Sequence, residues 1–365
     1  METTKLTKFD FEVHKKSAIE QYQKVYPLYS AFSENIRSIL EKSLNVAGIR
    51  YHSIEARPKD VEKFGEKASK PSLENPNEPK YKNPINDITD LTGARIITFF
   101  PKTVTEVDKL LNAEFDVIER SDKNDILEKE EKLGYQSVHY LIRLKESRIC
   151  LSEYSIFKER IAEIQVRTIL QHAWAEIEHD IEYKSSSIIP KAIKRRFMAL
   201  AGMLEIGDRE FQSIHDENLE LKKQNRESVS VGRFDEVEIT ADALKAYLDK
   251  KFGSDGRMTD FSYAYVARLL KKIGFQNLQQ VDESVRGYDN DKISRVIWDG
   301  IRQGQLSRFE DTILAALGDE IIKSHPYCTN TESNNEVWIE VFKTRLSLLN
   351  NAGIDTGKYR LHNIE

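Results

Sequence analysis

One short alternating segment carries the residues that could do chemistry. Ile164 and Val166 fall on one face of an extended strand, and Glu163 and Arg167 fall on the other. Thr168 then provides an N-cap for the helical pattern that follows. A carboxylate and a guanidinium four residues apart, beside a helix N-terminus, can bind a metal ion and phosphate groups. The segment therefore predicts a strand that leads into a helix and carries a cradle for a metal and phosphates.

Two earlier segments carry polar residues of similar potential. Residues 87–97 read DITDLTGARII, with acids before an apolar strand, and residues 134–139 read GYQSVH. Taken alone, Asp87 is best explained as a loop acid that caps local backbone groups, and we expect that role for it. Taken alone, Tyr135 would be a packing residue and His139 a histidine with its hydrogen bonds satisfied inside the fold.

In this order, the three segments resemble the synthetase domain of the RelA/SpoT family, which moves pyrophosphate from ATP to a ribose 3′-hydroxyl. The resemblance covers roughly residues 40–190, about the size of one domain. It implies an α+β fold of the nucleotidyltransferase-like type, a mixed β-sheet flanked by helices.

The resemblance also implies roles for particular residues. Asp90 and Glu163 would be catalytic and would hold Mg²⁺, and Glu163 would also assist loss of the proton from the attacking hydroxyl. Arg95 would stack on adenine, and Tyr135 would stack on the acceptor base. The full implied ATP-binding set is Arg57, Lys59, Arg95 and Arg167, and the implied acceptor-binding set is Tyr135, His139 and His172. Lys63 stands where the family often has a serine.

Two acceptors are compatible with such a site. GTP or GDP would give (p)ppGpp, whereas toxic small synthetases of the family use the 3′-terminal adenosine of tRNA. His172 stands where many alarmone synthetases carry an asparagine, and Glu130 and Glu131 stand where a lysine is often found, so guanosine specificity is weakened. We expect alarmone synthesis, with tRNA pyrophosphorylation as the alternative and a non-catalytic nucleotide-binding protein as a second alternative. The joint presence of the implied catalytic and acceptor residues argues against the last.

The elements that must position these residues follow from apolar periodicity. A long helix is expected over residues 11–44, and Arg57 and Lys59 flank a strand end before the next helix. Residues 69–84 contain four prolines among polar residues and are expected to form a surface loop. The other elements expected in this half are a helix over 103–112, a strand over 115–118, a charged loop over 121–133, and helices over 169–184 and from 190 onward. In the helix over 169–184, Trp174, Ile177 and Ile181 are expected to share one face.

The second half predicts an all-α domain without a chemical motif. The helical periodicity breaks at residues 226–235, which predicts domains over 1–230 and 236–365. Tyr263 and Tyr265 are expected to pack in its core rather than plug a pocket of the first domain. Helices are expected over 241–252, 261–273, 292–303, 309–323 and 336–350. This domain lacks the usual ligand-sensing modules of long family members, and in this it resembles the antitoxin half of fused toxin and antitoxin synthetases. The sequence is compatible with a regulatory domain that a protein trigger releases, for example in phage defence. It is also compatible with an oligomerisation domain.

Composition sets the remaining bounds. The chain has 365 residues, 39% hydrophobic and 32% charged, with a formal net charge of −5, which gives no global reason to expect nucleic-acid binding. Two cysteines, Cys150 and Cys328, support neither a disulfide framework nor a zinc site. No signal peptide or membrane span is expected, so the protein is predicted to be cytoplasmic. The segment before the synthetase region is too short for the family's hydrolase domain, so synthesis without hydrolysis is expected.

Overall fold

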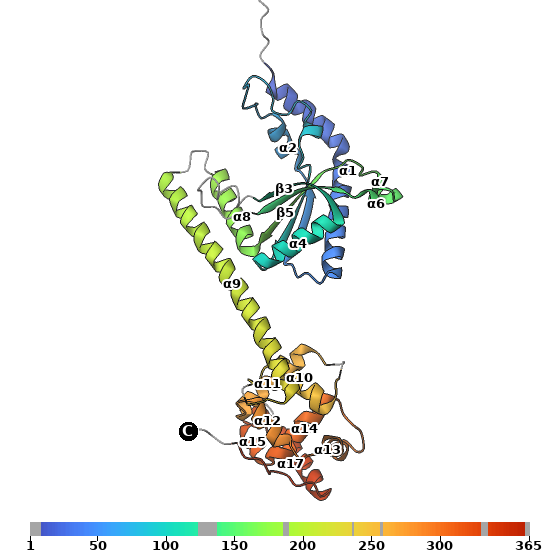
Figure 1. The fold of residues 1–365 in the computed structure, drawn as a ribbon, viewed down its shortest axis with the longest axis vertical. Coiled ribbons are helices and arrows are strands. Elements are labelled where there is room, and N and C mark those ends of the chain that lie inside the picture. The colour runs from blue at the N-terminus through green and yellow to red at the C-terminus, as the bar shows by residue number, and fades with distance from the viewer. Residues whose placement is uncertain are drawn as a thin grey trace, which may run out of the picture. The chain divides into compact units, whose positions relative to one another are not determined.

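A computed structural model describes residues 9–122, 137–184, 190–235, 237–255, 258–329 and 335–361, excluding the side chains of 182–184 and 194. The chain divides into two compact units, Met1–Ile214 and His215–Glu365 (Figure 1). Helix α9, Lys191–Val231, begins in the first unit and ends in the second. Each unit is described by itself.

The first unit is built on a five-stranded mixed sheet. Its strands are β1 (Ser53–Pro58), β2 (Thr92–Thr98), β3 (Phe115–Asp122), β4 (Val138–Leu144) and β5 (Ala162–Thr168). The strand order is β1-β2-β5-β4-β3, and β2 and β5 are the parallel pair among antiparallel neighbours. Sheet and flanking helices together confirm the α+β fold expected from the sequence.

One face of the sheet is apolar and is covered by two helices. Ile96 of β2 and Ile164 of β5 lie in one hydrophobic core with Phe32 and Leu40 of α1 (Phe11–Val46) and Leu111 of α4 (Pro101–Glu114). Strand side chains alternate between the two faces, so the neighbours of these residues point to the opposite side. That opposite face carries the polar residues of β2, β4 and β5.

Shorter helices complete the first unit. They are α2 (Val61–Ala68), α3 (Pro84–Asp87), α6 (Glu146–Ile149), α7 (Ser152–Ser155) and α8 (Ile169–Lys184). Trp174 of α8 is buried against α9, whereas Ile177, which was predicted to lie on the same face, is 55% exposed. Asp87 accepts a hydrogen bond from the Asn83 backbone N–H at 2.7 Å, which confirms its capping role.

The regular secondary structure of the second unit is helical in its described residues, apart from an isolated β-bridge between Glu238 and Asn277. Its helices are α10 (Ala241–Phe252), α11 (Asp260–Ile273), α12 (Leu278–Val285), α13 (Asn290–Ile297), α14 (Gln305–Leu317), α15 (Glu320–Ser324), α16 (Pro326–Thr329) and α17 (Asn335–Asn351). Tyr263 is 1% exposed and donates a hydrogen bond to Gln305, so its assignment to the core is confirmed. None of the helices in the described ranges is long and apolar enough to cross a membrane.

Two helices of this unit are shorter than the sequence predicts. The helix expected over 292–303 ends at Ile297, because Asp299 and Gly300 adopt positive φ values of 48° and 83°. The helix expected over 309–323 is divided at Gly318, where φ is +57° and a Cβ would lie 2.8 Å from the Gly357 Cα. A side chain at Gly318 would therefore collide with the last stretch of the chain.

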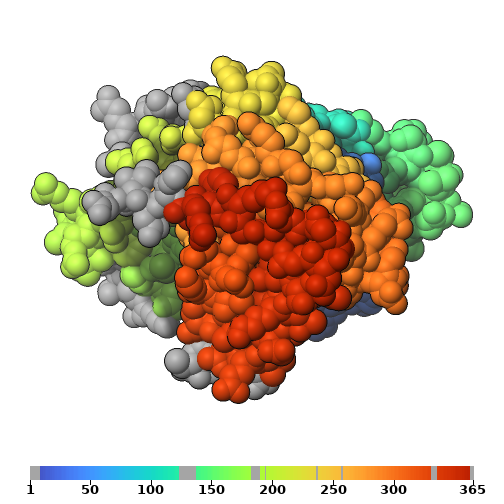
Figure 2. All heavy atoms as spheres, turned by 90° about the horizontal axis from the view of Figure 1, so that it is seen from below, coloured from blue at the N-terminus to red at the C-terminus, as the bar shows by residue number. Residues whose placement is uncertain are grey.

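That last stretch runs along the end of α14. The Gly357 N–H donates to the Ala315 carbonyl at 2.9 Å, and the Tyr359 N–H donates to the Ala316 carbonyl at 3.0 Å. The Tyr359 ring also stacks on Phe275, with centroids 6.0 Å apart. In Figure 2, α17 and the residues after it (dark red) form part of the visible surface of this unit.

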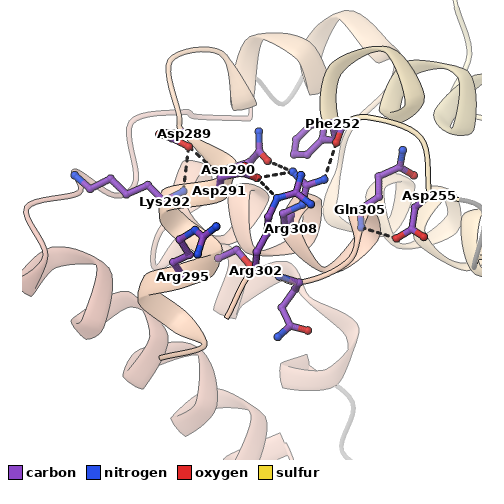
Figure 3. Close-up of polar contacts among 12 residues, drawn as sticks. Phe252, Asp255, Asp289, Asn290, Asp291, Lys292, Arg295, Arg302, Gln305 and Arg308 are labelled. Atoms are coloured by element: carbon purple, nitrogen blue, oxygen red, sulfur yellow. Dashed lines mark hydrogen bonds and ion pairs between the residues drawn. The ribbon is translucent and has the colours of Figure 1, made fainter. Parts of the chain in front are cut away.

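A buried arginine joins three segments of the second unit. Arg308 on α14 is 4% exposed and donates to the Phe252 carbonyl at 2.6 Å, to Asp291 at 2.7 Å and to Asn290 (Figure 3). Arg302 approaches Asp291 at 2.9 Å from a far more exposed position. The end of α10 and the start of α13 are thus both fixed to one guanidinium.

Candidate active site

Two hollows lie over the polar face of the sheet. One has a volume of about 400 Å³ and is lined by Lys59, Asp90 and Glu163, among others. The other has a volume of about 500 Å³ and is lined by His139 of β4, Arg167 of β5 and several residues of α8. Both hollows share Glu55, Arg57, Lys63, Arg95 and Gln165. Adjoining hollows with shared walls can hold two substrates whose reacting groups meet.

Asp90 is held by two lysines at the mouth of the first hollow. Its carboxylate lies 2.7 Å from the Lys59 Nζ and 3.0 Å from the Lys67 Nζ. Burial by itself raises the pKa of Asp90, but the hydrogen bonds and positive charges of the two lysines outweigh burial and hold the pKa below its usual value. Asp90 is therefore ionised at neutral pH.

The two lysines owe their positions to the packing of α2 on α1. The Tyr22 ring stacks on Phe64 with centroids 4.3 Å apart, and the Tyr22 hydroxyl donates to the Lys59 carbonyl at 2.9 Å. At Gly65 a Cβ would lie 2.6 Å from Ile19, so the absent side chain allows the two helices to approach closely. This packing aims Lys67 at Asp90.

Glu163 belongs to a chain of three polar side chains. Its Oε1 lies 2.7 Å from the His139 Nδ1, and the His139 Nε2 lies 2.8 Å from the Ser137 Oγ. Burial raises the pKa of Glu163, but the hydrogen bond and charge of His139 outweigh it, so the net pKa is lowered. Because an ionised carboxylate can only accept, Nδ1 of His139 carries the proton in this contact.

Arg95 lies at the centre of the shared wall. Its guanidinium is 2.9 Å from Glu176 of α8 and 4.0 Å from Glu55 of β1. About a third of its side chain remains exposed to the hollows. A planar guanidinium at this place can stack on a base or bind phosphate oxygens, once Glu176 releases it.

Arg167 is more buried than a surface phosphate ligand would be. It is 3% exposed, its Nη2 lies 3.4 Å from Gln165, and its buried Nε has no hydrogen-bond partner within the described ranges. Burial, together with the charge of Arg95, lowers the pKa of Arg167 to about 10. A buried guanidinium with an unused donor suits an anionic ligand in the second hollow.

His172 stands one turn before Glu176 on α8. Its Nδ1 lies 3.8 Å from the Glu176 carboxylate, beyond hydrogen-bond range. Burial and the charge of Arg167 lower the pKa of His172, so the imidazole is neutral at pH 7. His172 does not line either hollow, in contrast to His139.

The donor set suits Mg²⁺. Asp90 and Glu163 line the same hollow, and the charge of Asp90 raises the pKa of Glu163. Glu163 contacts His139 through Oε1, which leaves Oε2 as the oxygen that could bind a metal ion. Mg²⁺ is usually bound by one or two carboxylates completed by water and phosphate oxygens, so two protein ligands are sufficient.

The structure brings together most of the expected residues and adds others. Asp90, Glu163, Arg57, Lys59 and Arg95 line the first hollow, whereas Tyr135 lies outside the described residues. The interpretation of the sequence did not identify the Lys67, Ser137 or Glu176 contacts. Lys67 lies eight residues after Lys59 on the helix that begins at Val61, a spacing that could have suggested it.

Comparisons with known proteins agree with the geometry. Residues 56–188 match the family described as the region found in RelA / SpoT proteins. The chain is 28% identical over 186 residues to GTP pyrophosphokinase YjbM of Bacillus subtilis, covering 50% of this chain and 80% of that protein. It is 33% identical over 106 residues to GTP pyrophosphokinase YwaC of the same organism, covering 29% of this chain and 48% of that protein.

Among solved structures, the small alarmone synthetase 1 from Bacillus subtilis matches with a TM-score of 0.45 and 25% identity, covering 55% of this chain and 99% of that one. The family match over residues 56–188 lies within the first unit. Over this part the chain is similar to proteins named GTP pyrophosphokinases, and it continues into a second, helical unit.

Proposed function

We propose that this protein transfers the β,γ-pyrophosphate of ATP to the 3′-hydroxyl of GTP or GDP and so makes (p)ppGpp. The observation that carries the proposal is the pair of carboxylates, Asp90 and Glu163, in one of two adjoining hollows with a cationic shared wall. Relatives over the same region are named GTP pyrophosphokinases, which supports the guanine nucleotide as acceptor.

ATP is assigned to the first hollow. Arg57, Lys59 and Lys63 place positive charges along it, and these neutralise the triphosphate. Arg95 stacks on adenine in this assignment, a role that requires it to exchange its contact with Glu176 for the base.

The acceptor is assigned to the second hollow, which His139 and Arg167 line. The guanidinium of Arg167, with its unused Nε, binds the acceptor's phosphates, and Tyr135 stacks on its base. Glu163 lines the first hollow and contacts His139, which lines the second. In this proposal Glu163 takes the proton of the 3′-hydroxyl, while the His139 N–H keeps its carboxylate ionised and oriented.

Mg²⁺ held by Asp90 and Glu163 would supply charge neutralisation for the transferred phosphates. Lys59 and Lys67 keep Asp90 ionised and ready for that role.

The test is to incubate the full chain with γ-labelled ATP and Mg²⁺ and, in parallel, with GTP, GDP and bulk tRNA. The expected result is label on the guanine nucleotide, in the outer phosphate of a new 3′-diphosphate group. Label on the tRNA 3′ end instead would mean that tRNA, rather than a guanine nucleotide, is the acceptor of the same pyrophosphate transfer. Absence of labelled product with all three acceptors, from the full chain and from residues 1–231 alike, would contradict the proposal and favour a non-catalytic nucleotide-binding protein.

A further inference from the structure

The second unit contains a hollow unrelated to the chemistry of the first unit. It has a volume of about 250 Å³ and lies between α11, α14, α16 and α17. Its walls are mostly apolar, and their aromatic residues include Tyr265, Trp298, Tyr327, Trp338 and Phe342. Two of the three tryptophans in the sequence are thus in this one wall.

The rings form a connected surface that remains open to solvent. Tyr327 and Trp338 have centroids 4.9 Å apart, and the Tyr265 hydroxyl donates to the Tyr327 hydroxyl. Trp298, Tyr327 and Trp338 are 37%, 38% and 37% exposed. Large aromatic residues that are accessible in one cluster indicate a binding surface.

Two acids of α14 also line the hollow, and they differ in their partners. Asp311 accepts from the Trp298 Nε1 at 2.8 Å and pairs with Arg345 at 3.2 Å, so both its oxygens are engaged. Arg345 also lies over the Trp298 ring, 4.9 Å from the centroid. Glu310 has no ion pair among the described residues.

Glu310 therefore contributes a carboxyl group that forms no ion pair with the described residues. Burial, and then the charge of Asp311, raises the pKa of Glu310 to about 7, with Arg345 acting in the opposite direction. Arg345 is the cation of the lining, and it pairs with Asp311 at 3.2 Å rather than with Glu310. Burial lowers the pKa of His325 to about 4 and raises that of Tyr265, so neither of these groups adds a positive charge near neutral pH. A carboxylate in an aromatic hollow is stabilised by a bound cation that replaces the lost water.

We propose that this hollow binds an alkylammonium group, presented as a lysine side chain by a protein partner of the second unit. Aromatic faces attract cations through the ring quadrupole, and an adjacent carboxylate supplies the matching charge. The volume suits one extended side chain and is below that of pockets for drug-sized ligands, which favours a side chain over a larger cofactor.

The first experiment titrates the full chain with n-butylammonium chloride at pH 8 and constant ionic strength, following tryptophan fluorescence. Trp298 and Trp338 report on the hollow, while Trp174 is 5% exposed in the first unit and provides a constant background. The expected result is a saturable change that n-butanol, its neutral counterpart, does not reproduce. An equal response to n-butanol, or none to either, would overturn the proposal.

Two variants test whether the negative charge of Glu310 is needed for binding. Glu310→Gln keeps the shape of the side chain and is expected to weaken n-butylammonium binding by about tenfold or more. Glu340→Gln, an exposed acid of α17 outside the hollow, is the matched control and should bind as the parent does. If Glu310→Gln binds unchanged, the carboxylate is not the counter-ion. Circular dichroism checks that both variants are folded.

Acidification provides an independent measurement. Protonated Glu310 no longer attracts a cation, so the affinity should fall by about tenfold per pH unit below pH 7 and be constant above it. A flat profile between pH 5 and 8 would contradict the role of Glu310.

The source of the ammonium group is tested by comparing a capped Gly-Lys-Gly peptide with spermidine. Tighter binding of the peptide, or equal binding, supports a partner's lysine. Much tighter binding of spermidine would instead assign the hollow to a free polyamine and overturn the lysine assignment.

Discussion

At the scale of single residues, the site depends on two carboxylates that are kept ionised by different neighbours. Lysines surround Asp90, whereas a histidine hydrogen-bonds to Glu163. Neither carboxylate packs in the apolar core, so we propose that their charges act mainly on the substrates.

Glu163→Gln and Asp90→Asn are each expected to lower pyrophosphate transfer by more than about a hundredfold, the scale for a positioned catalytic group. The fold should remain, because both changes conserve shape. Labelled-product assays at saturating Mg²⁺ measure the loss, and Glu66→Gln, an exposed acid of α2, serves as the control. Near-parental turnover in either variant would show that the residue concerned is not part of the machinery.

Lys67→Met tests the electrostatic support of Asp90. With one lysine removed, the pKa of Asp90 should rise toward its ordinary value, so activity should disappear at a higher pH during acidification than in the parent. The stability contributed by the depressed pKa exists above the unfolded-state pKa and is lost as pH falls through the folded-state pKa, so it should shrink in the variant.

The measurement is a profile of kcat/KM from pH 4 to pH 8, with Lys70→Met, an exposed lysine outside the hollow, as the control. An unshifted acid limb in Lys67→Met would mean that Lys59 alone sets the pKa of Asp90.

The sequence drew attention to the motif residues, whose roles stay predictions, but it did not indicate their partners. Asp90, Glu163 and His139 stand in recognisable segments, whereas Lys67 reaches Asp90 only because Gly65 lets α2 approach α1. Such a contact depends on how two helices pack, and a local pattern contains no information about that distance. The burial of Arg167 was missed for a related reason. The alternation of residues along β5 shows which face of the sheet Arg167 lies on, but it does not show what covers that face.

At the scale of elements, strands and long helices followed their periodicity. The parallel pairing of β2 with β5 places Gly93 opposite Glu163, so the two motif segments become neighbours. Helix ends in the second unit were less predictable, because Asp299, Gly300 and Gly318 interrupt patterns that remain apolar on both sides. The short helices α12 and α16 gave too few turns to be recognised.

Arg308→Met is expected to reduce the free energy of unfolding of the second unit by about 2–4 kcal/mol, because buried acceptors at Phe252 and Asn290 lose their donor. Urea denaturation followed by tryptophan fluorescence measures the change. Arg302→Met removes the exposed contact with the same Asp291 and should cost less than about 1 kcal/mol. Equal losses in the two variants would mean that the buried network of Figure 3 does not join α10 to α13 and α14.

At the scale of the whole molecule, we propose that the second unit restrains the first until a partner binds. Residues 1–231, which end with α9, should then be more active in vitro and more toxic on expression than the full chain. If each molecule is either restrained and inactive or unrestrained and active, the activity falls by the fraction of molecules that are restrained. A trigger then raises the activity by binding the unrestrained form preferentially. Growth inhibition, labelled product and molecular mass of both proteins provide the measurement.

Glu163→Gln in the shortened chain should remove the toxicity. A folded, monomeric shortened chain with no gain in activity would exclude restraint. Lower activity or solubility, with a change in mass, would instead indicate that the second unit builds an oligomer.

The hydrogen bonds from residues 357 and 359 to α14 have a consequence for biosynthesis. A ribosome releases residues 1–214 first, so the sheet and its two hollows can form while the rest is still being translated. The second unit can complete its fold only after the residues that follow α17 have been translated. At typical rates of translation the first unit would stand alone for about 10–30 s in each nascent chain. Any control that the second unit exerts on the first therefore begins late, and each new molecule passes through an interval without it.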